Sequence, residues 1–391
     1  MTDYLAMKEK VMEVIRNNAD ELFALNCDIA DHPELSGKEY ETSKKIVNLL
    51  RGKGYDVEYP FDGLDTAFRA TWGPRRERKV AILTEYDALP EIGHACGHSL
   101  SGSISCLAGL ALKDLSEELN ASIDVIGTPT EEEDGAKCKM VDDGLFDDYD
   151  MAIMVHLNNA NTVQPTLLAL NSNMYVFHGK AAHASAKPWD GINAFNAGQL
   201  MFHAVDMLRQ HVTPDVRLHG IFRNGGEAPN VVPETVSLEM YMRALSRPYL
   251  NELIDKVFKC AEAGCLATGA TYTWYETAHP YDDIRVNKTG LDVLREVYAE
   301  LGLEENEPDG TIFGSSDVGN VSYRCPCFQP CLQLVPADVP IHTREFESYV
   351  RSDKARECLE IGAEIIAFPI LKIFGDEEKY QAMKRDFLEQ E

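Results

Sequence analysis

The sequence predicts an α/β protein, in which a first domain has a mainly parallel sheet with helices on both faces and is interrupted by an inserted α+β domain. From residue 79 onward, apolar strand-like segments alternate with helical segments, which is the pattern of a mainly parallel sheet. Beyond residue 171 the order becomes strand, helix, strand, strand, helix, strand, which is typical of a separate α+β unit. With 391 residues, the chain is long enough for two domains.

The first domain is predicted from segments whose apolar periodicity is clear. In the first helix, Leu100, Ile104 and Leu107 recur at three- and four-residue intervals, as on one face of a helix. Pro129 closes the second strand. The segments are strands over 79–87, 121–130 and 150–157, and helices over 99–119 and 135–146.

The inserted domain is predicted over 172–284, and the first domain over 1–171 and 285–391. A strand and turn open the insert, and a helix over 290–303 marks the return of the chain to the first domain. The other segments of the insert are a helix over 191–211, strands over 217–226 and 235–244, a helix over 249–268, and a strand over 270–279.

The composition of the chain indicates which kinds of partner are excluded and in which cellular compartment the protein is expected. The formal net charge of −27 argues against nucleic acid and against an anionic membrane surface as partners, because both require positive patches. The N-terminus mixes charged and apolar residues at helical spacing and lacks the apolar core of a secretory signal. Ten cysteines in such a chain are expected to be reduced thiols. We therefore expect a cytoplasmic protein.

Residues that can bind metal follow each predicted strand of the first domain. Glu85 and Asp87 come after the first strand, and the loop GHACGH (93–98) follows them. The acidic run TEEEDG (130–135) follows the second strand, and His156 ends the third. Because ligands bind at the carboxyl ends of parallel strands, we expect these side chains to converge in space.

The loop GHACGH has three competing interpretations: a structural zinc clip, a reactive thiol, or part of a catalytic metal site. A zinc clip needs a second Cys/His pair, and CPCFQPC (325–331) lies far away in sequence without a matching histidine pair. A nucleophilic cysteine needs a partner histidine and an orienting acid. Neither explains the carboxylates at the neighbouring strand ends. We interpret Cys325, Cys327 and Cys331 as reduced thiols in a strand and turn.

The other candidates are ambiguous when each is taken alone. A run of four acids is typical of a solvated helix start, but here it directly follows a strand and Pro129, which favours two positioned carboxylates with different functions. His156 alone fits a core histidine. His183 and His342 each fit a surface histidine.

Taken together, the motifs EYDALP, GHACGH, PTEEEDGAK, GKAAHAS, NVVP, GSSDVGN and a late IHT occur in one order. This pattern resembles the M20 metallopeptidase family, and within it the amidohydrolase branch with a Cys-Gly-His metal loop. It is most similar to the group of aminobenzoyl-glutamate hydrolase and the aminoacylase-1-like dipeptidases. The resemblance runs from about residue 30 to about residue 350.

The resemblance implies a centre of two divalent metal ions. Cys96 would be a thiolate shared by both ions, His98 and His156 would complete one ion, and Glu132 with His342 the other. Two adjacent cations favour thiolate over thiol, so a bridging cysteine is chemically coherent. The ligand types suit Zn²⁺ or Mn²⁺, with Co²⁺ also compatible.

The resemblance also implies roles outside the ligand set. Glu131, the first of the paired glutamates, would be the general base, and Asp87 would orient a ligand from behind. The insert would be a lid and dimerisation domain in which His183 reaches the substrate carbonyl. Asn230 and Arg243 would bind a substrate carboxylate, a task that suits the forked guanidinium group.

This sequence departs from the wider family at two positions. Glu85 stands where other branches carry a metal-binding histidine, a departure shared with the cysteine branch. Ser99 follows His98 where some members of the branch have Asp or Asn.

The reaction implied is hydrolysis of an amide in a small, carboxylate-bearing substrate: an N-acyl amino acid, an aminobenzoyl-glutamate-like conjugate, or a dipeptide. A homodimer through the lid domain is expected. One alternative is a catalytically inactive metal-binding or interaction protein on the same fold, and another is a thiol-dependent hydrolase that uses Cys96 as nucleophile. The complete set of candidate ligands argues against the first alternative.

Overall fold

The computed structural model of the protein describes residues 4–306 and 314–389. It divides into two compact units: unit 1 is Met1–Thr166 with Ile284–Glu391, and unit 2 is Leu167–Asp283. The insert was predicted over 172–284. Residues 310–313, which precede the motif GSSDVGN, lie outside the described residues.

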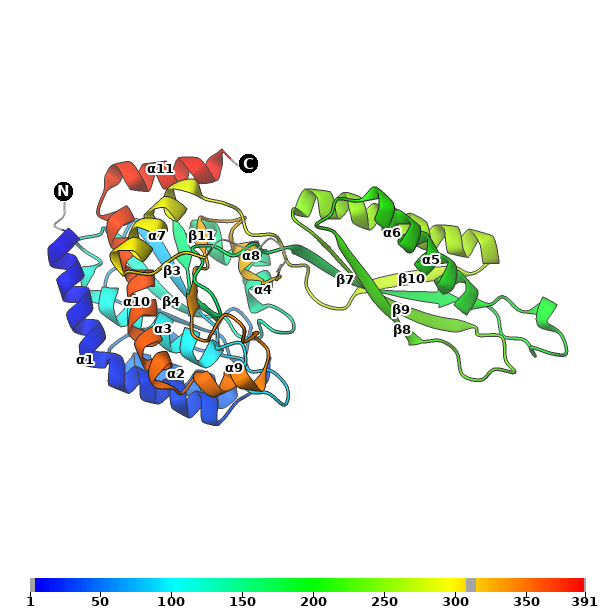
Figure 1. The fold of residues 1–391 in the computed structure, drawn as a ribbon, viewed down its shortest axis with the longest axis horizontal. Coiled ribbons are helices and arrows are strands. Elements are labelled where there is room, and N and C mark those ends of the chain that lie inside the picture. The colour runs from blue at the N-terminus through cyan, green and yellow to red at the C-terminus, as the bar shows by residue number, and fades with distance from the viewer. Residues whose placement is uncertain (1–3, 307–313, 390–391) are drawn as a thin grey trace. The chain divides into compact units, whose positions relative to one another are not determined.

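The core of unit 1 is a six-stranded sheet whose central strands run parallel, which confirms the predicted fold class (Figure 1). Its central strands are largely buried because helices cover both sides. The strands are β1 (Asp56–Glu58), β2 (Phe68–Thr71), β3 (Arg78–Thr84), β4 (Ala121–Gly127), β5 (Met151–Ile153) and β11 (Cys327–Phe328).

The strand order is β1-β2-β4-β3-β5-β11. β4, β3, β5 and β11 are parallel, and β2 and β1 extend the β4 edge in antiparallel fashion. The parallel strands therefore direct the loops after β3, β4 and β5 to the same edge of the sheet.

The predicted strand over 150–157 is wrong in one respect, because it breaks into β5 and β6 (His156–Asn158). β6 pairs in parallel with β12 (Cys331–Gln333) in a separate two-stranded sheet. The partner segment breaks at the same level, where Pro330 has no N–H to continue a ladder. The break leaves His156 at the first residue of a strand rather than near the end of one.

Helices enclose this sheet on both faces (Figure 1). α3 packs on β3 and β4 and is covered by α1 and α10, so every residue of α3 is buried. It begins at His98 and ends at residue 112, where a short 3₁₀ turn follows. The helix therefore ends earlier than the predicted residue 119. The helices are α1 (Tyr4–Asp31), α2 (Tyr40–Gly52), α3 (His98–Leu112), α4 (Ala136–Asp142), α7 (Lys288–Glu300), α8 (Val318–Val321), α9 (Arg344–Tyr349), α10 (Asp353–Phe374) and α11 (Glu377–Leu388).

Unit 2 is a four-stranded antiparallel sheet with two helices packed on one face, and it has its own apolar core (Figure 1). The strand order is β10-β7-β9-β8, which leaves β10 and β8 at the edges. The elements are β7 (Ala169–His178), α5 (Ala194–Leu208), β8 (Arg217–Asn224), β9 (Thr235–Ala244), α6 (Arg247–Thr268) and β10 (Thr271–Glu276).

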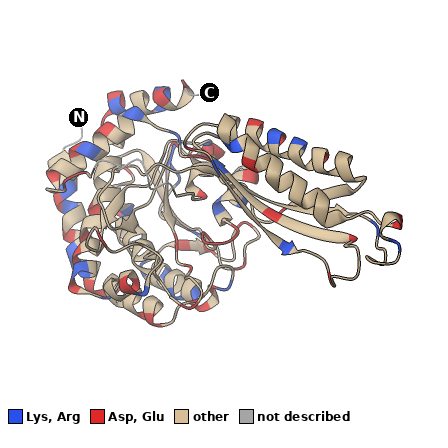
Figure 2. Cartoon of the chain, turned by 45° about the vertical axis from the view of Figure 1, so that its right-hand side comes forward, with Lys and Arg blue, Asp and Glu red and all other residues tan. Residues whose placement is uncertain are grey.

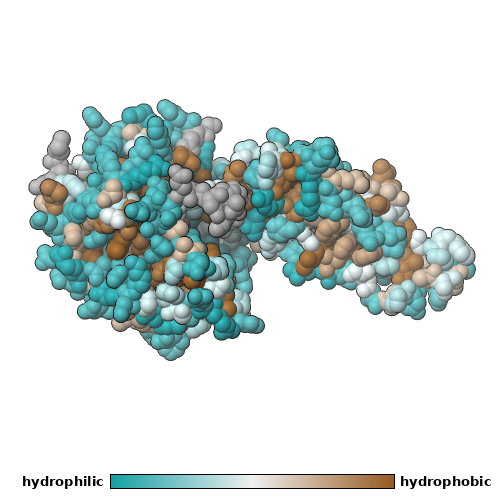
Figure 3. Space-filling model, in the orientation of Figure 1, coloured by the Kyte–Doolittle hydropathy of each residue, from teal (hydrophilic) through white to brown (hydrophobic). Residues whose placement is uncertain are grey.

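Charged residues of both signs are interspersed over the helices of each unit (Figure 2). The visible face in Figure 3 is mostly hydrophilic, with apolar residues in small groups. None of the helices in the described part of the chain combines the length and the hydrophobicity needed to cross a bilayer.

Candidate metal centre

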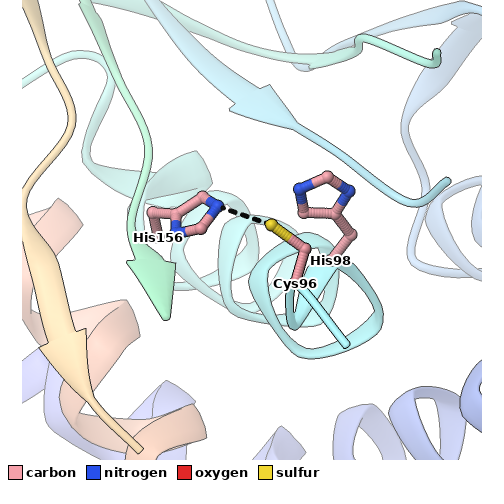
Figure 4. A group of neighbouring side chains, drawn as sticks. All are labelled: Cys96, His98 and His156. Atoms are coloured by element: carbon pink, nitrogen blue, oxygen red, sulfur yellow. Dashed lines mark hydrogen bonds between the residues drawn. The ribbon is translucent and has the colours of Figure 1, made fainter. Parts of the chain in front are cut away.

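The structure brings the candidate ligands of unit 1 together in two groups that share one cysteine. Cys96, His98 and His156 offer ligand atoms that all lie within 4.8 Å of one another, and so do Cys96, Glu132 and His342. The first group is drawn in Figure 4, where His156 points at the sulfur atom of Cys96 and His98 lies beside it. The shared residue is the buried thiol, Cys96.

His98 is held from behind by Asp87. One ring nitrogen of His98, Nδ1, lies 3.0 Å from Asp87 Oδ1, and the other carboxylate oxygen accepts hydrogen bonds from Ser36 Oγ (2.7 Å) and from the backbone N–H of Glu132 (3.0 Å). Although burial alone would raise the pKa of Asp87, the neighbouring His98 and these donors hold it below its usual value. Asp87 is therefore an acceptor for Nδ1–H, which leaves Nε2 of His98 directed away from it.

His156 is oriented by the backbone. Its Nδ1 lies 2.8 Å from the carbonyl oxygen of Leu157, so Nδ1 carries the proton, and its Nε2 lies 3.4 Å from Cys96 Sγ (Figure 4). Both histidines thus keep Nε2 available for a metal ion.

His342 comes from a loop far along the chain, just before α9. Its backbone N–H donates to the carbonyl oxygen of Ala95 (2.9 Å), and its Nε2 lies 3.6 Å from Glu132 Oε1. Its φ is +62°, a conformation that costs a non-glycine residue energy and that clusters at functional sites. A backbone contact to the cysteine loop thus brings this histidine to the centre.

The turn after β4 separates the acidic run into two pairs. Thr130 has a φ of +56°, and its N–H donates to Glu39 Oε1 (3.0 Å), so the turn is fixed at its first residue. Glu131 and Glu132 are half-buried toward the centre, whereas the next two acids, Glu133 and Asp134, are exposed. The exposure pattern favours Glu131 and Glu132 as the functional pair.

The ligand atoms at this centre fit divalent cations. His98 Nε2 and Glu132 Oε1 are buried and have no hydrogen-bond partner among the described residues, although buried polar groups are normally paired. Burial, followed by the nearby Glu85 and Glu132, raises the pKa of Glu131 well above its usual value, as expected of a buried carboxyl group among other carboxylates. A set of one thiol, three imidazoles and a carboxylate suits Zn²⁺, Co²⁺ or Mn²⁺.

A cysteine nucleophile is disfavoured by the electrostatic surroundings of Cys96 and His156. Burial, followed by Glu132, raises the pKa of Cys96 well above its usual value, whereas a nucleophilic cysteine needs a lowered one. Burial also lowers the pKa of His156 to about 4, so a thiolate–imidazolium pair between these residues is disfavoured.

The lid candidates lie at two separate places in unit 2. His183 is exposed in the loop after β7, where its backbone pairs in antiparallel fashion with that of Val231. The carbonyl oxygen of Asn230 accepts a hydrogen bond from the backbone N–H of Ala184 (3.0 Å). Arg243 lies near the opposite end of β9, half-buried on the sheet face away from the helices. The span of β9 from Thr235 to Arg243 is roughly 27 Å at about 3.4 Å per residue.

Two buried residues near the centre received no role from the sequence. Lys137 and Asp317 lie in the motifs PTEEEDGAK and GSSDVGN, which assigned them no function. In the structure they form an ion pair (2.6 Å) and are fully buried.

The three cysteines of CPCFQPC are buried thiols. Burial raises the pKa of Cys325, Cys327 and Cys331, so none has the character of a reactive thiolate. Cys331 pairs through its backbone with His156 across β12 and β6, so this segment positions a candidate ligand.

Comparison with known proteins gives a consistent result along the whole chain. A model of peptidase family M20/M25/M40 matches residues 81–368. Xaa-Arg dipeptidase of Mus musculus is 33% identical over 397 residues, covering 97% of this chain and 92% of that protein. A p-aminobenzoyl-glutamate hydrolase polypeptide of Escherichia coli is 25% identical, covering 92% and 90%.

Solved structures share the fold at lower identity. The aminobenzoyl-glutamate utilization protein of Klebsiella pneumoniae superposes with a TM-score of 0.70 at 20% identity, over 92% of this chain and 98% of that one. A dinuclear metal-binding peptidase of Bacillus subtilis has a TM-score of 0.70 at 19% identity, over 92% and 99%.

Proposed function

Since this chain belongs to the M20 peptidase family and is a metal-dependent hydrolase of amide bonds, we propose that Cys96 bridges two divalent ions at its active site. His98 and His156 would hold one ion, and Glu132 and His342 would hold the other. The observation that carries this assignment is that Cys96 belongs to both candidate ligand groups. We propose Zn²⁺ or Mn²⁺ as the native metal, with Co²⁺ as a functional substitute.

Glu131 is the general base of the proposed reaction. The bound ions would polarise the scissile carbonyl and acidify the attacking water. Glu131 takes the proton of that water and delivers it to the leaving amine. In the absence of metal, burial and the neighbouring carboxylates raise the pKa of Glu131 above its usual value, which is the direction expected of a general base. Asp87 keeps His98 in the tautomer that presents Nε2.

The proposed substrate is a dipeptide or an N-acyl amino acid with a free carboxylate. Two relatives support this choice by name, one a dipeptidase and one a hydrolase of p-aminobenzoyl-glutamate. Arg243 lies on the open face of the lid sheet, and β8 places His219 on the same face beside it. We propose that Arg243 and Asn230 recognise substrate carboxylates.

The lid candidates at the two ends of β9 lie too far apart to serve one small substrate from a single chain. His183 and Asn230 are near one end of β9 and Arg243 is near the other, roughly 27 Å away, whereas a dipeptide is about 7 Å from end to end at about 3.3–3.6 Å per residue. This separation supports a homodimer in which His183 acts in the partner's active site. An isologous contact through unit 2 provides that exchange.

Chelation tests the proposed function. Removal of metal from the purified enzyme is expected to abolish hydrolysis of a dipeptide panel, and added Zn²⁺ or Mn²⁺ should restore it. Elemental analysis should give two ions per chain in the restored enzyme. Activity that persists in metal-free protein would contradict the proposal and revive a thiol mechanism.

Replacing His183 by alanine is expected to lower kcat by about 10²–10³-fold, the usual loss for one donor to an oxyanion. The imidazole is exposed, so the melting temperature should stay unchanged. The exposed His279 of the same unit provides a matched control, and its alanine variant should keep full activity.

Subunit mixing tests whether His183 acts across the dimer. His183→Ala and Glu131→Gln chains, each of strongly reduced activity, are co-folded and the heterodimer is isolated with two different tags. One of its two sites then has an intact base and an intact partner histidine, so part of the activity should return. No recovery in verified heterodimers would place the action of His183 within its own chain.

We also propose a cytoplasmic location. All ten cysteines are free, as expected of a protein in a reducing compartment.

A further inference from the structure

Lys137, at the second residue of α4, is a fully buried lysine beside the active site. Its Nζ donates to Glu85 Oε1 (2.6 Å) and to Asp317 Oδ1 (2.6 Å), and its backbone N–H donates to Asp317 Oδ2 (3.0 Å). All three side chains have 0% relative exposure. Lysine is almost never buried so completely unless it is paired, because removing its charge from water is strongly unfavourable.

The ammonium lies among carboxylates that could themselves bind a metal ion. Carboxylate oxygens of Glu85, Glu131 and Asp317 lie within 4.8 Å of one another, which is the geometry of a cation site. Among the described residues, Lys137 is the only lysine or arginine that pairs with Glu85 or Asp317. This carboxylate cluster, Glu85–Glu131–Asp317, therefore contains its own cation.

The carboxylate cluster and the metal centre share a residue. Glu131 also belongs to the group formed with His98 and Glu132, and Glu85 Oε2 lies 3.4 Å from His98 Nε2. A metal ion that entered the carboxylate cluster would thus bind Glu131 directly. A Glu131 bound to metal would be a much weaker proton acceptor.

We propose that the ammonium group of Lys137 takes the place of a metal ion in the carboxylate cluster, and so keeps Glu131 available as the base. This inference rests on the proposed role of Glu131. Lys137 is a positioning residue, since it acts on the reaction through Glu131 and Glu85. Although burial would lower the pKa of Lys137, Asp317 and Glu85 outweigh it and raise the pKa, so the side chain stays charged.

The test is the number of metal ions bound by Lys137→Met, in which a neutral side chain of similar length replaces the ammonium. Wild-type and variant enzymes are equilibrated with Mn²⁺, passed through gel filtration and analysed for metal. The variant is expected to hold one more Mn²⁺ per chain than the wild type. Its turnover should fall by about 10²–10⁴-fold, the range for loss of a general base.

A double variant provides the matched control. Lys137→Met/Asp317→Asn removes one carboxylate from the cluster but keeps an oxygen that accepts from the backbone N–H of residue 137. It should bind the same number of Mn²⁺ ions as the wild type. If Lys137 excludes a metal ion, the number of bound Mn²⁺ ions should rise only in Lys137→Met and not in the double variant.

Two outcomes would overturn the inference. One is equal Mn²⁺ content in folded wild type and Lys137→Met. The second outcome applies if Lys137→Met is unstable without metal. In that case the inference fails if added Mn²⁺ raises the melting temperature of the variant no more than it raises that of the wild type. Because the readout is the difference between variant and wild type, a wild-type content other than two ions would count against the proposed two-metal centre and not against this inference.

Discussion

Replacing Glu131 by glutamine is expected to leave both metal ions bound and to lower turnover by about 10²–10⁴-fold, because it removes the base and keeps the ligand set. Glutamine has the size of glutamate but cannot accept the proton of the attacking water. The measurement is kcat together with elemental analysis of the same preparation.

The matched control is Glu133→Gln, two residues along the same acidic run. Glu133 is exposed, whereas Glu131 is half-buried, so its replacement should change kcat little. If Glu131→Gln instead emptied a metal site while Glu132→Gln kept both ions, the roles of the two glutamates would be exchanged.

The pH dependence of kcat/KM gives a second readout for Glu131. Without metal, burial and the neighbouring carboxylates raise the pKa of Glu131, and a protonated Glu131 cannot act as the base. Activity should therefore rise with pH through the folded-state pKa of this group. Two bound cations would lower the pKa of Glu131. In the metal-loaded enzyme, the rise of kcat/KM with pH should therefore occur at a lower pH than the pKa of Glu131 without metal.

Replacing Cys96 by serine is expected to lower metal affinity by more than about 100-fold, since changes outside a ligand set already cost about 10–100-fold. A hydroxyl group is a much poorer bridging ligand than a thiolate, and less negative charge would remain between the two cations. Metal titration of the apo variant, followed by activity at saturating metal, separates lost binding from lost turnover.

The control for thiol loss is Cys27→Ser on α1, which lies outside both ligand groups. It should bind metal as the wild type does. Two tightly held ions in Cys96→Ser would exclude the bridging role of the cysteine.

The parallel core and the convergence of strand ends could be predicted from the sequence, because both depend on local signals. Apolar runs, the first of them followed by a helical periodicity and the second closed by Pro129, indicate the strands. The edge where the parallel strands end fixes the place of Glu131, which follows β4. The family resemblance added His342, which has no local signal of its own.

What the sequence could not predict depends on residues far apart in the chain. The break between β5 and β6 follows from Pro330 in the partner segment. Likewise, the helix α4 gave no sign that Lys137 would be buried, since its two carboxylate partners lie 52 and 180 residues away. Such long-range charge pairing leaves no periodic pattern in the sequence.

The chain enters and leaves unit 2 along adjacent segments. Leu170 N–H donates to Tyr281 O (2.7 Å) and Tyr281 N–H donates to Leu170 O (3.0 Å), while Arg247 binds both carbonyl oxygens. When unit 1 folds, the whole insert therefore acts as a surface loop whose two ends lie side by side. The entropy lost in closing such a loop depends only weakly on its length. A short linker joining residues 166 and 284 should allow unit 1 to be produced as an autonomous domain, and lids of other sizes could be grafted at the same two positions.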